Sequence, residues 1–254
     1  MKNIKVILIV LTILMIAIVM IHKKSSQAAH GGEEQTATTQ YLEDSRDGQK
    51  YKTVKIGDQI WMAENLNYET ENSYCYRNSA DSCAKYGRLY TWAAAMDSAG
   101  KFSKTGKGCG DNTTCSPTYP VQGICPKGWH LPSESDWETL LVTVGGPVAI
   151  ARGPKRHEST AGIALKSTHD WFYAGEGGKH GNGTDGYGFT GLPAGERIST
   201  GLYNSVKTKA YFWSSTESTN KAFARNMRLN VNFAEAWMDP GHKSYGFSVR
   251  CLRD

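Results

Sequence analysis

The stretch Cys125–Gly145, CPKGWHLPSESDWETLLVTVG, decides the fold because it contains the clearest helix of the chain. Ser133 is a natural N-cap residue, since its hydroxyl can accept a hydrogen bond from a backbone N–H of the first turn. The carboxylates of Glu134 and Asp136 lie at the positive end of the helix dipole. One apolar face runs through the segment and comprises Trp137, Leu140, Leu141 and Val144. The pattern predicts a helix that begins after Ser133 and ends at Gly145.

Strand patterns lie on both sides of this helix. Residues 50–56 and 59–62 are rich in β-favouring side chains and flank Gly57-Asp58, which predicts a hairpin with a two-residue turn. Residues 211–215 have the composition of a buried strand. Residues 223–231 alternate apolar and polar side chains, which predicts a half-buried strand.

A second helix and a long loop complete the pattern. Apolar side chains spaced i, i+3, i+4 and i+7 predict a short helix over residues 89–99. Residues 175–188 contain seven glycines and are expected to form a loop. Two helices, several antiparallel strands and long central loops predict an α+β domain.

The N-terminal segment, residues 1–24, predicts a membrane anchor or a signal peptide. Two lysines precede an apolar run from Val6 to Ile21, and a basic flank follows directly, as in an anchor. Cleavage after Ala28, as in a signal peptide, is the alternative. The polar residues 25–43 predict a flexible stalk, and residues 44–254 predict the folded domain.

Six cysteines, all beyond residue 74, form an even set in a chain with an export signal. Their spacing predicts two local pairs, Cys75–Cys83 and Cys109–Cys115. Cys125 and Cys251 remain and are expected to pair with each other. Cys251 falls on the inward side of an alternating tail, residues 246–252, and its bridge closes a loop of 127 residues. A zinc site is the competing interpretation, but the C-x2-C and H-x3-H spacings are missing. Structural disulfides place the domain outside the cytoplasm.

The charge of the chain argues against nucleic acid as a partner. The formal net charge is +5, and the first 40 residues contribute four lysines and two glutamates, which leaves +3 for the domain. The domain has no dense run of lysine and arginine of the kind that a phosphate backbone requires. Nucleic acid is therefore not an expected partner.

Short motifs follow one another along residues 44–254. They are Asp47-Gly48-Gln49-Lys50-Tyr51, residues 59–68 (QIWMAENLNY), 86–92 (YGRLYTW), 125–132 (CPKGWHLP), Gly188-Phe189 with 192–195 (LPAG), 212–217 (FWSSTE) and 246–251 (GFSVRC). In this order they resemble the Fibrobacter succinogenes major paralogous domain family. The resemblance implies an exported or surface-attached bacterial protein, and it implies no particular activity.

A more distant resemblance concerns the fold. Residues 128–138 (GWHLPSESDWE) look like the helix start of formylglycine-generating-type domains, and residues 246–251 look like their last strand. Those domains share the C-type-lectin-like architecture, in which the two ends of the domain pair as strands beside two helices and long loops. The resemblance therefore implies a C-type-lectin-like fold stapled by disulfides.

Catalytic patterns are missing from the sequence. It contains neither G-x-S-x-G nor H-E-x-x-H, and its histidines are scattered. A formylglycine-generating oxidase needs a close pair of reactive thiols late in the chain, where this sequence has Cys251 alone. We expect neither a catalytic residue nor a cofactor.

The sequence is rich in aromatic side chains, with 7 Trp and 13 Tyr. Exposed rings stack on the apolar faces of sugars, whereas packing in the core is the alternative for each of them. The candidates in loop-like or polar surroundings are Trp171, Tyr173, Tyr187, Tyr203 and Trp237. Asn182 and Asp185 could also contribute oxygen ligands to Ca²⁺, although an Asx-type turn that orders the glycine-rich loop is the preferred interpretation.

Three functions are compatible with these features. The first is a non-enzymatic cell-surface module that binds polysaccharide or a surface partner. The second is a structural component of the cell envelope that packs against like domains. The third is an enzyme, a hydrolase or a formylglycine-generating-like oxidase, whose site the sequence does not reveal.

Overall fold

The computed structural model describes residues 40–150, 158–173 and 179–254. The predicted anchor or signal peptide, with its expected hydrophobic helix, lies outside these residues, as does the predicted stalk up to residue 39. Within the described ranges, no helix is both long enough and apolar enough to cross a membrane. The last four residues of the predicted stalk are instead a strand, because Leu42 packs against the core while residues 40–43 pair with the next strand.

The first sheet joins the two ends of the domain, and its strand order is β1-β2-β3-β14-β6. Its strands are β1 (Gln40–Glu43), β2 (Lys50–Ile56), β3 (Gln59–Met62), β6 (Trp129–His130) and β14 (Leu252–Arg253). The predicted hairpin is confirmed: β2 and β3 pair antiparallel, and Gly57 takes the positive φ of 59° that the turn needs. The last strand, β14, lies between β3 and β6.

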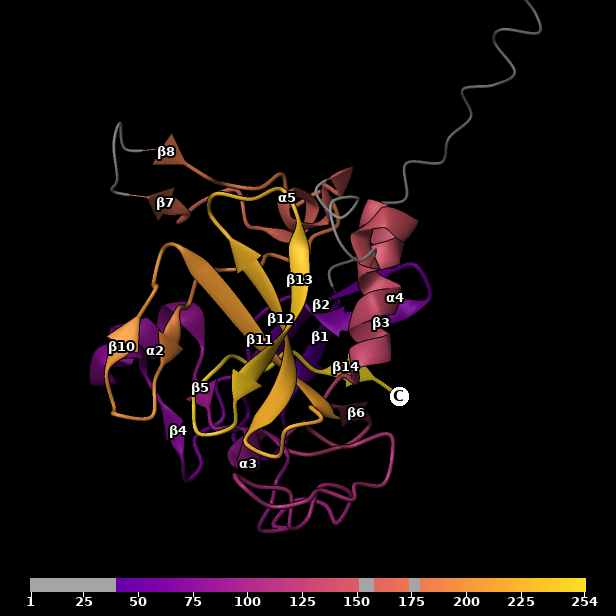
Figure 1. The fold of residues 1–254 in the computed structure, drawn as a ribbon, viewed down its shortest axis with the longest axis vertical. Helices are drawn as coiled ribbons and strands as arrows, with labels where there is room; N and C mark the ends of the chain where they lie inside the picture. The colour runs from indigo at the N-terminus through magenta and orange to yellow at the C-terminus, as the bar shows by residue number, and fades with distance from the viewer. Residues whose placement is uncertain (1–39, 151–157, 174–178) are drawn as a thin grey trace, which may run out of the picture. The chain divides into compact units, whose positions relative to one another are not determined.

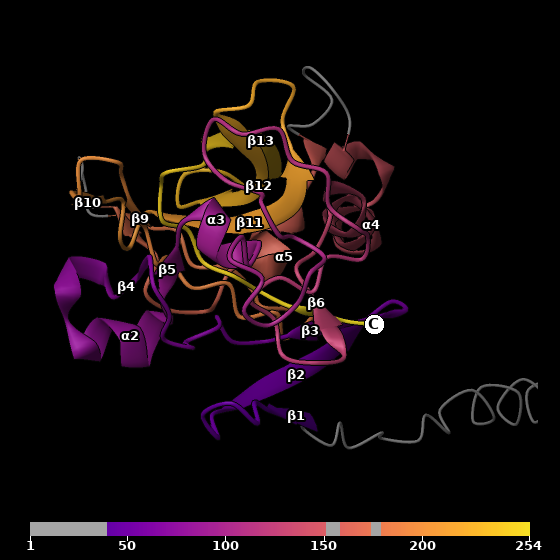
Figure 2. The ribbon, with the colours of Figure 1, turned by 90° about the horizontal axis from the view of Figure 1, so that it is seen from below.

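The second sheet consists of three long antiparallel strands (Figures 1 and 2). They are β11 (Lys209–Glu217), β12 (Phe223–Asn230) and β13 (Ala236–His242). Tyr211 and Trp213 of β11 face one hydrophobic cluster, whereas Ala210 and Phe212 face another. The sheet therefore lies between two cores, and this is why residues 210–213 form a continuous apolar run.

The strand over residues 223–231 is confirmed, but the prediction that only half of it is buried is wrong. Asn226 is 1% and Asn230 8% exposed, so its polar side is covered as well. The same holds for the tail, where the side chains of Ser248 and Arg250 are both 0% exposed. Both segments are buried on two sides because cores lie on each side of the second sheet.

The predicted main helix is confirmed as α4 (Glu134–Gly145), with Gly146 as the C-cap at φ 70°. Its apolar face packs on the first sheet, where the rings of Trp137 and Trp61 are 4.6 Å apart. The predicted helix over residues 89–99 is wrong at both ends, because the observed helix spans Trp92–Ala95. Thr91 caps a helix of only one turn, because the two residues before it pair as a strand.

The remaining elements are short. The helices are α2 (Ala80–Tyr86), α3 (Trp92–Ala95) and α5 (Ala161–Leu165), with 3-10 turns η1 (Tyr76–Asn78) and η2 (Pro147–Ile150). The two-residue strands are β4 (Ser73–Tyr74), β5 (Leu89–Tyr90), β7 (Phe172–Tyr173), β8 (Lys179–His180), β9 (Glu196–Arg197) and β10 (Tyr203–Asn204). The domain is α+β, as predicted, but it contains more short helices than the two expected.

All six cysteines form disulfides in the predicted pairs, Cys75–Cys83, Cys109–Cys115 and Cys125–Cys251. Cys125 and Cys251 are both fully buried in the same core. Three disulfides are typical of proteins that fold outside the cytoplasm.

Candidate functional site

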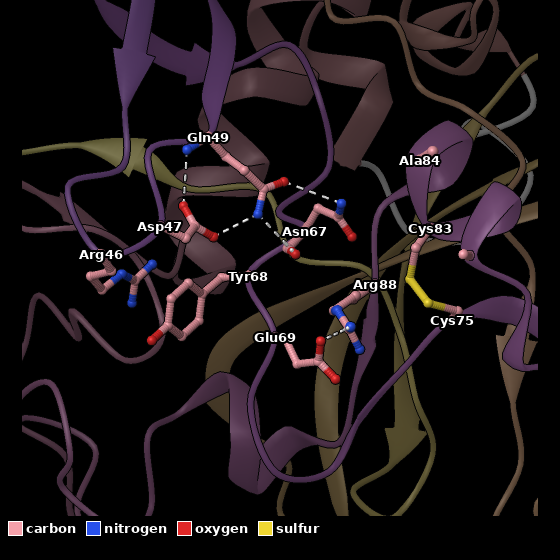
Figure 3. Close-up of a pocket in the computed structure, with 11 residues that line it drawn as sticks. Arg46, Asp47, Gln49, Asn67, Tyr68, Glu69, Cys75, Cys83, Ala84 and Arg88 are labelled. Atoms are coloured by element: carbon pink, nitrogen blue, oxygen red, sulfur yellow. Dashed lines mark hydrogen bonds and ion pairs between the residues drawn. A yellow bond between two sulfur atoms is a disulfide. The ribbon is translucent and has the colours of Figure 1, made fainter.

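A groove of two adjoining cavities lies between the start of β2, the segment after β3 and helix α2. The cavities have volumes of about 570 and 320 Å³. They share Gln49, Asn67, Cys83 and Ala84, so they form one continuous depression, which we call the polar groove. Figure 3 shows the larger cavity, where the side chain of Gln49 meets those of Asp47 and Asn67, and Arg88 points toward Glu69.

The segment after β3 lines both cavities and is fixed by buried polar contacts. The Asn65 amide donates to the carbonyl of Tyr86 at 2.8 Å and accepts from Nε of Arg250 at 2.6 Å. The hydroxyl of the fully buried Tyr90 donates to the carbonyl of Tyr68 at 2.7 Å. These contacts hold the backbone of the segment in place, so its side chains are preorganised.

Helix α2 forms the opposite wall. Asp81 in its first turn and Lys85 in its last turn both complement the helix dipole. The Cys75–Cys83 disulfide ties it to the preceding turn. It ends at Gly87, at φ 71°, where a Cβ would lie 2.9 Å from the carbonyl oxygen of Leu66. Only glycine allows helix and segment to approach this closely.

Three polar side chains form a hydrogen-bonded chain across the larger cavity. Nε2 of Gln49 donates to Asp47 at 2.5 Å, and Nδ2 of Asn67 donates to Oε1 of Gln49 at 3.2 Å. The carboxylate of Asp47 can only accept, so it fixes the orientation of both amides. Oδ1 of Asn67 then remains a buried acceptor without a hydrogen-bond partner among the described residues. Such a group is rare in folded proteins, and a water molecule or a ligand donor would satisfy it.

Two arginines line the same cavity, and their partners differ. Arg46 forms a two-pronged pair with the fully buried Asp44, at 2.8 and 2.6 Å, and lies 4.0 Å from the ring centre of Tyr68. Arg88 pairs with Glu69 at 2.6 Å. The side chain of Arg88 is 13% exposed and that of Glu69 is 80% exposed.

The smaller cavity adds a phenol and an amine. Burial raises the pKa of Tyr51 above its usual range, although the hydrogen bond from the Asn67 backbone opposes this, so the side chain stays a neutral hydroxyl. Lys85 donates to Asp170 at 2.7 Å, and this hydrogen bond raises the pKa of the amine. The groove therefore combines neutral polar groups with charged ones.

The rings predicted to bind ligand do not gather in one place. Trp171 is 0% exposed and donates to Ser167 and to the Gly191 carbonyl, so the prediction that it contacts ligand is wrong. It is buried because its apolar face belongs to the core around α4. The side chain of Tyr173 lies outside the described residues.

The three other predicted rings are partly accessible. Tyr187 is 41% exposed. Tyr203 is half-buried against Tyr76, and its hydroxyl donates to Asn78 at 2.7 Å. Trp237 is half-buried on β13 between Phe233 and the guanidinium of Arg228. Tyr203 and Trp237 thus belong to different contact clusters, and whether any of these rings binds a ligand stays a prediction.

The predicted calcium ligands are engaged within the chain. Oδ1 of Asn182 accepts from the Trp171 backbone at 3.0 Å, and the carboxylate of Asp185 accepts from the backbone and hydroxyl of Thr190 at 2.6 and 2.8 Å. Their oxygens order the glycine-rich loop through partners 11 and 5 residues away, which differ from the partner two residues on that an Asx-type turn uses. In the part of the chain that the structure describes, no group of three or more His, Cys, Asp or Glu could hold a metal ion.

Sequence reasoning placed no ligand-binding residue in the polar groove. A signal was nevertheless present, because Asp47, Gln49, Asn67 and Arg88 all lie within the motifs that carry the family resemblance. None of these four side chains is fully buried, unlike Asn65 and Arg250 in the same motifs, and they are therefore candidates for a site.

The comparisons with known proteins give one match. The model of a family described as the Fibrobacter succinogenes major domain matches residues 54–253. Neither a curated protein nor a solved structure matches the chain.

Proposed function

This chain belongs to the Fibrobacter succinogenes major domain family, and we propose that it is an exported, non-enzymatic module that binds polysaccharide in the polar groove. Residues 1–24 would attach it to the membrane or direct its export, and the following polar residues would hold the domain away from the cell envelope. The three disulfides support a location outside the cytoplasm.

The observation that carries the proposal is the buried, unpartnered Oδ1 of Asn67. A sugar presents many hydroxyl donors, and one of them would complete the chain from Asp47 through Gln49 to Asn67. The ring of Tyr68 and the neutral hydroxyl of Tyr51 add the amphipathic groups that suit a sugar surface.

The chemistry of the groove favours binding over catalysis. A general acid needs a carboxyl group whose protonated form is favoured by burial. Asp47 is exposed and accepts hydrogen bonds from Gln49, and Glu69 is 80% exposed and paired with a cation. All cysteines are in disulfides, which also speaks against a thiol-dependent oxidase.

We further propose that the domain has a C-type-lectin-like arrangement. The support is the pairing of its two ends, since β14 lies between β3 of the opening hairpin and β6. The disulfide between Cys125 and Cys251 joins the approach to the main helix with the approach to the last strand.

A binding screen with the full chain tests the proposal. The chain should be retained by at least one member of a panel of soluble and insoluble polysaccharides, and Asn67→Ala should weaken that retention. If no polysaccharide in the panel retains the chain, the proposal is wrong. Self-association of the chain in that case would favour the structural-component alternative, and capture by a surface protein would favour a protein partner.

A further inference from the structure

We infer that the polar groove selects acidic polysaccharides, with Arg88 receiving the carboxylate of a sugar acid and Glu69 occupying that position until the ligand arrives. This inference rests on the proposed function and adds the charge class of the ligand. It follows from the partners of the two arginines and from the neighbouring orphan acceptor.

Arg88 is the arginine that is able to exchange its partner. Two guanidinium nitrogens of Arg46 pair with Asp44, whose side chain is 0% exposed. The third guanidinium nitrogen of Arg46 donates to the Ile124 carbonyl at 2.8 Å. Arg46 is therefore part of the scaffold. Arg88 has one carboxylate contact and a long contact to Ser73 at 3.5 Å, which leaves N–H donors of its guanidinium for a ligand.

Glu69 is suited to leave Arg88. Its side chain is 80% exposed, so it can turn into water without breaking a packed contact. An ion pair with one exposed partner is weak because water screens the charges and the long side chain loses freedom. A ligand carboxylate that enters the cavity would meet the largely buried guanidinium with less screening and in two-pronged geometry, and it would bind more strongly.

The orphan acceptor specifies the second feature of the ligand. Asn67 is two residues before Glu69 and lines the same cavity as Arg88 (Figure 3). Its Oδ1 requires a donor, and a carboxylate alone provides none. A molecule with both a carboxylate and hydroxyl groups matches both sites, and the monomers of acidic polysaccharides have this composition.

Two probes that differ only in methyl esterification of their carboxyl groups provide the test. Tetragalacturonate and its methyl ester share the same sugar backbone, and their dissociation constants for the full chain would be measured by titration calorimetry. We expect the acid to bind about tenfold or more tightly than the ester, because the ester loses the charge-assisted contact with Arg88. The preference should shrink as salt is added.

Two variants assign the preference to the proposed pair. Arg88→Gln should remove the preference for the acid. Glu69→Gln should tighten binding of the acid and leave binding of the ester unchanged, because the competing carboxylate is gone. Glu71→Gln removes the same charge from an exposed position two residues away that lines a different cavity, and it should have little effect. Since Glu69 is exposed, its variant tests the inference even if Arg88→Gln does not fold.

The outcomes separate the inference from the proposed function. Equal binding of acid and ester, or an acid preference that neither Arg88→Gln nor Glu69→Gln changes, would overturn the inference and leave polysaccharide binding intact. If neither tetrasaccharide binds but a neutral polysaccharide does, the inference is likewise wrong. If nothing in the polysaccharide panel binds, the proposed function fails and the inference fails with it.

Discussion

At the scale of single residues, buried polar side chains hold this domain together in ways that alternation in the sequence does not reveal. Arg250 is 0% exposed and donates to the amide oxygen of Asn65 and to the carbonyls of Met62, Phe189 and Thr190. Burial lowers its pKa to about 9. Alternation with a period of two assigns the polar side chains of a strand to the side that faces solvent. It cannot reveal that a second core covers that side. The same limit explains why the burial of Ser248 and Asn226 was not predicted.

His130 makes the stability of the domain depend on pH. Burial opposes its protonation, but hydrogen bonding to the carboxylates of Asp136 and Asp254 outweighs this and raises its pKa; Nδ1 lies 2.8 Å from Asp254. The protonated form is thus favoured in the folded state, so this contribution is fully present below the usual histidine pKa of about 6.5 and is lost as pH rises through the raised value.

We therefore expect His130→Gln to cost more free energy of unfolding at pH 6 than at pH 8. Urea unfolding of the wild type and the variant at both pH values measures this difference. His242→Gln is the control, because that histidine contacts Ser244 and Tyr245 rather than a carboxylate. An equal cost at the two pH values would show that the carboxylates do not hold the proton on His130.

At the scale of secondary structure, elements with their own local signals could be predicted, and elements that depend on distant contacts could not. Helix α4 has a cap residue, first-turn acids and an apolar face within one segment. Helix α2 has seven residues, too few to be stable by itself, and the Cys75–Cys83 disulfide and its packing hold it in place. Residues 89–90 pair with β4, which overrides the helical spacing of their side chains.

The cap of α4 gives a direct test at this scale. Ser133 Oγ accepts from the Asp136 backbone at 3.2 Å, while the Asp136 carboxylate accepts from the Ser133 backbone at 2.8 Å. Ser133→Ala should lower the free energy of unfolding by about 1 kcal/mol. Thr139→Ala, at an exposed position of the same helix, should lower it by less than about 0.5 kcal/mol. Equal denaturation midpoints for Ser133→Ala and the wild type would mean that this cap does not stabilise the helix.

At the scale of the whole molecule, the disulfide pairing and the α+β class could be predicted, but the position of the polar groove could not. The pairing follows from local spacing, which leaves one long bridge. The groove combines residues 46–51, 63–69 and 75–88 with residues from 169 to 192, which come together only in the folded domain. No spacing in the sequence indicates that these side chains meet. The prediction of a binding site therefore relies on the aromatic residues of the central segment.

The long bridge should stabilise the whole domain more than a short one. Cys125 and Cys251 are 126 positions apart, whereas Cys109 and Cys115 are 6 apart. The chain-entropy model gives about 5 kcal/mol for the first bridge and about 2 kcal/mol for the second. Urea unfolding of the two double Cys→Ala variants should reproduce this order, and a larger loss for the short bridge would contradict it.

The most direct test of polysaccharide binding in the polar groove compares two positions on the molecule. Titration calorimetry with the best polysaccharide fragment from the screen would be applied to the full wild-type chain, to Asn67→Ala and to Trp237→Ala, with thermal unfolding as the check on folding. We predict that Asn67→Ala weakens binding about tenfold, as expected for the loss of hydrogen bonds made to a buried group, while Trp237→Ala binds like the wild type. Unchanged binding by a folded Asn67→Ala, together with a loss in Trp237→Ala, would move the site from the groove to the rings on the second sheet and contradict this account.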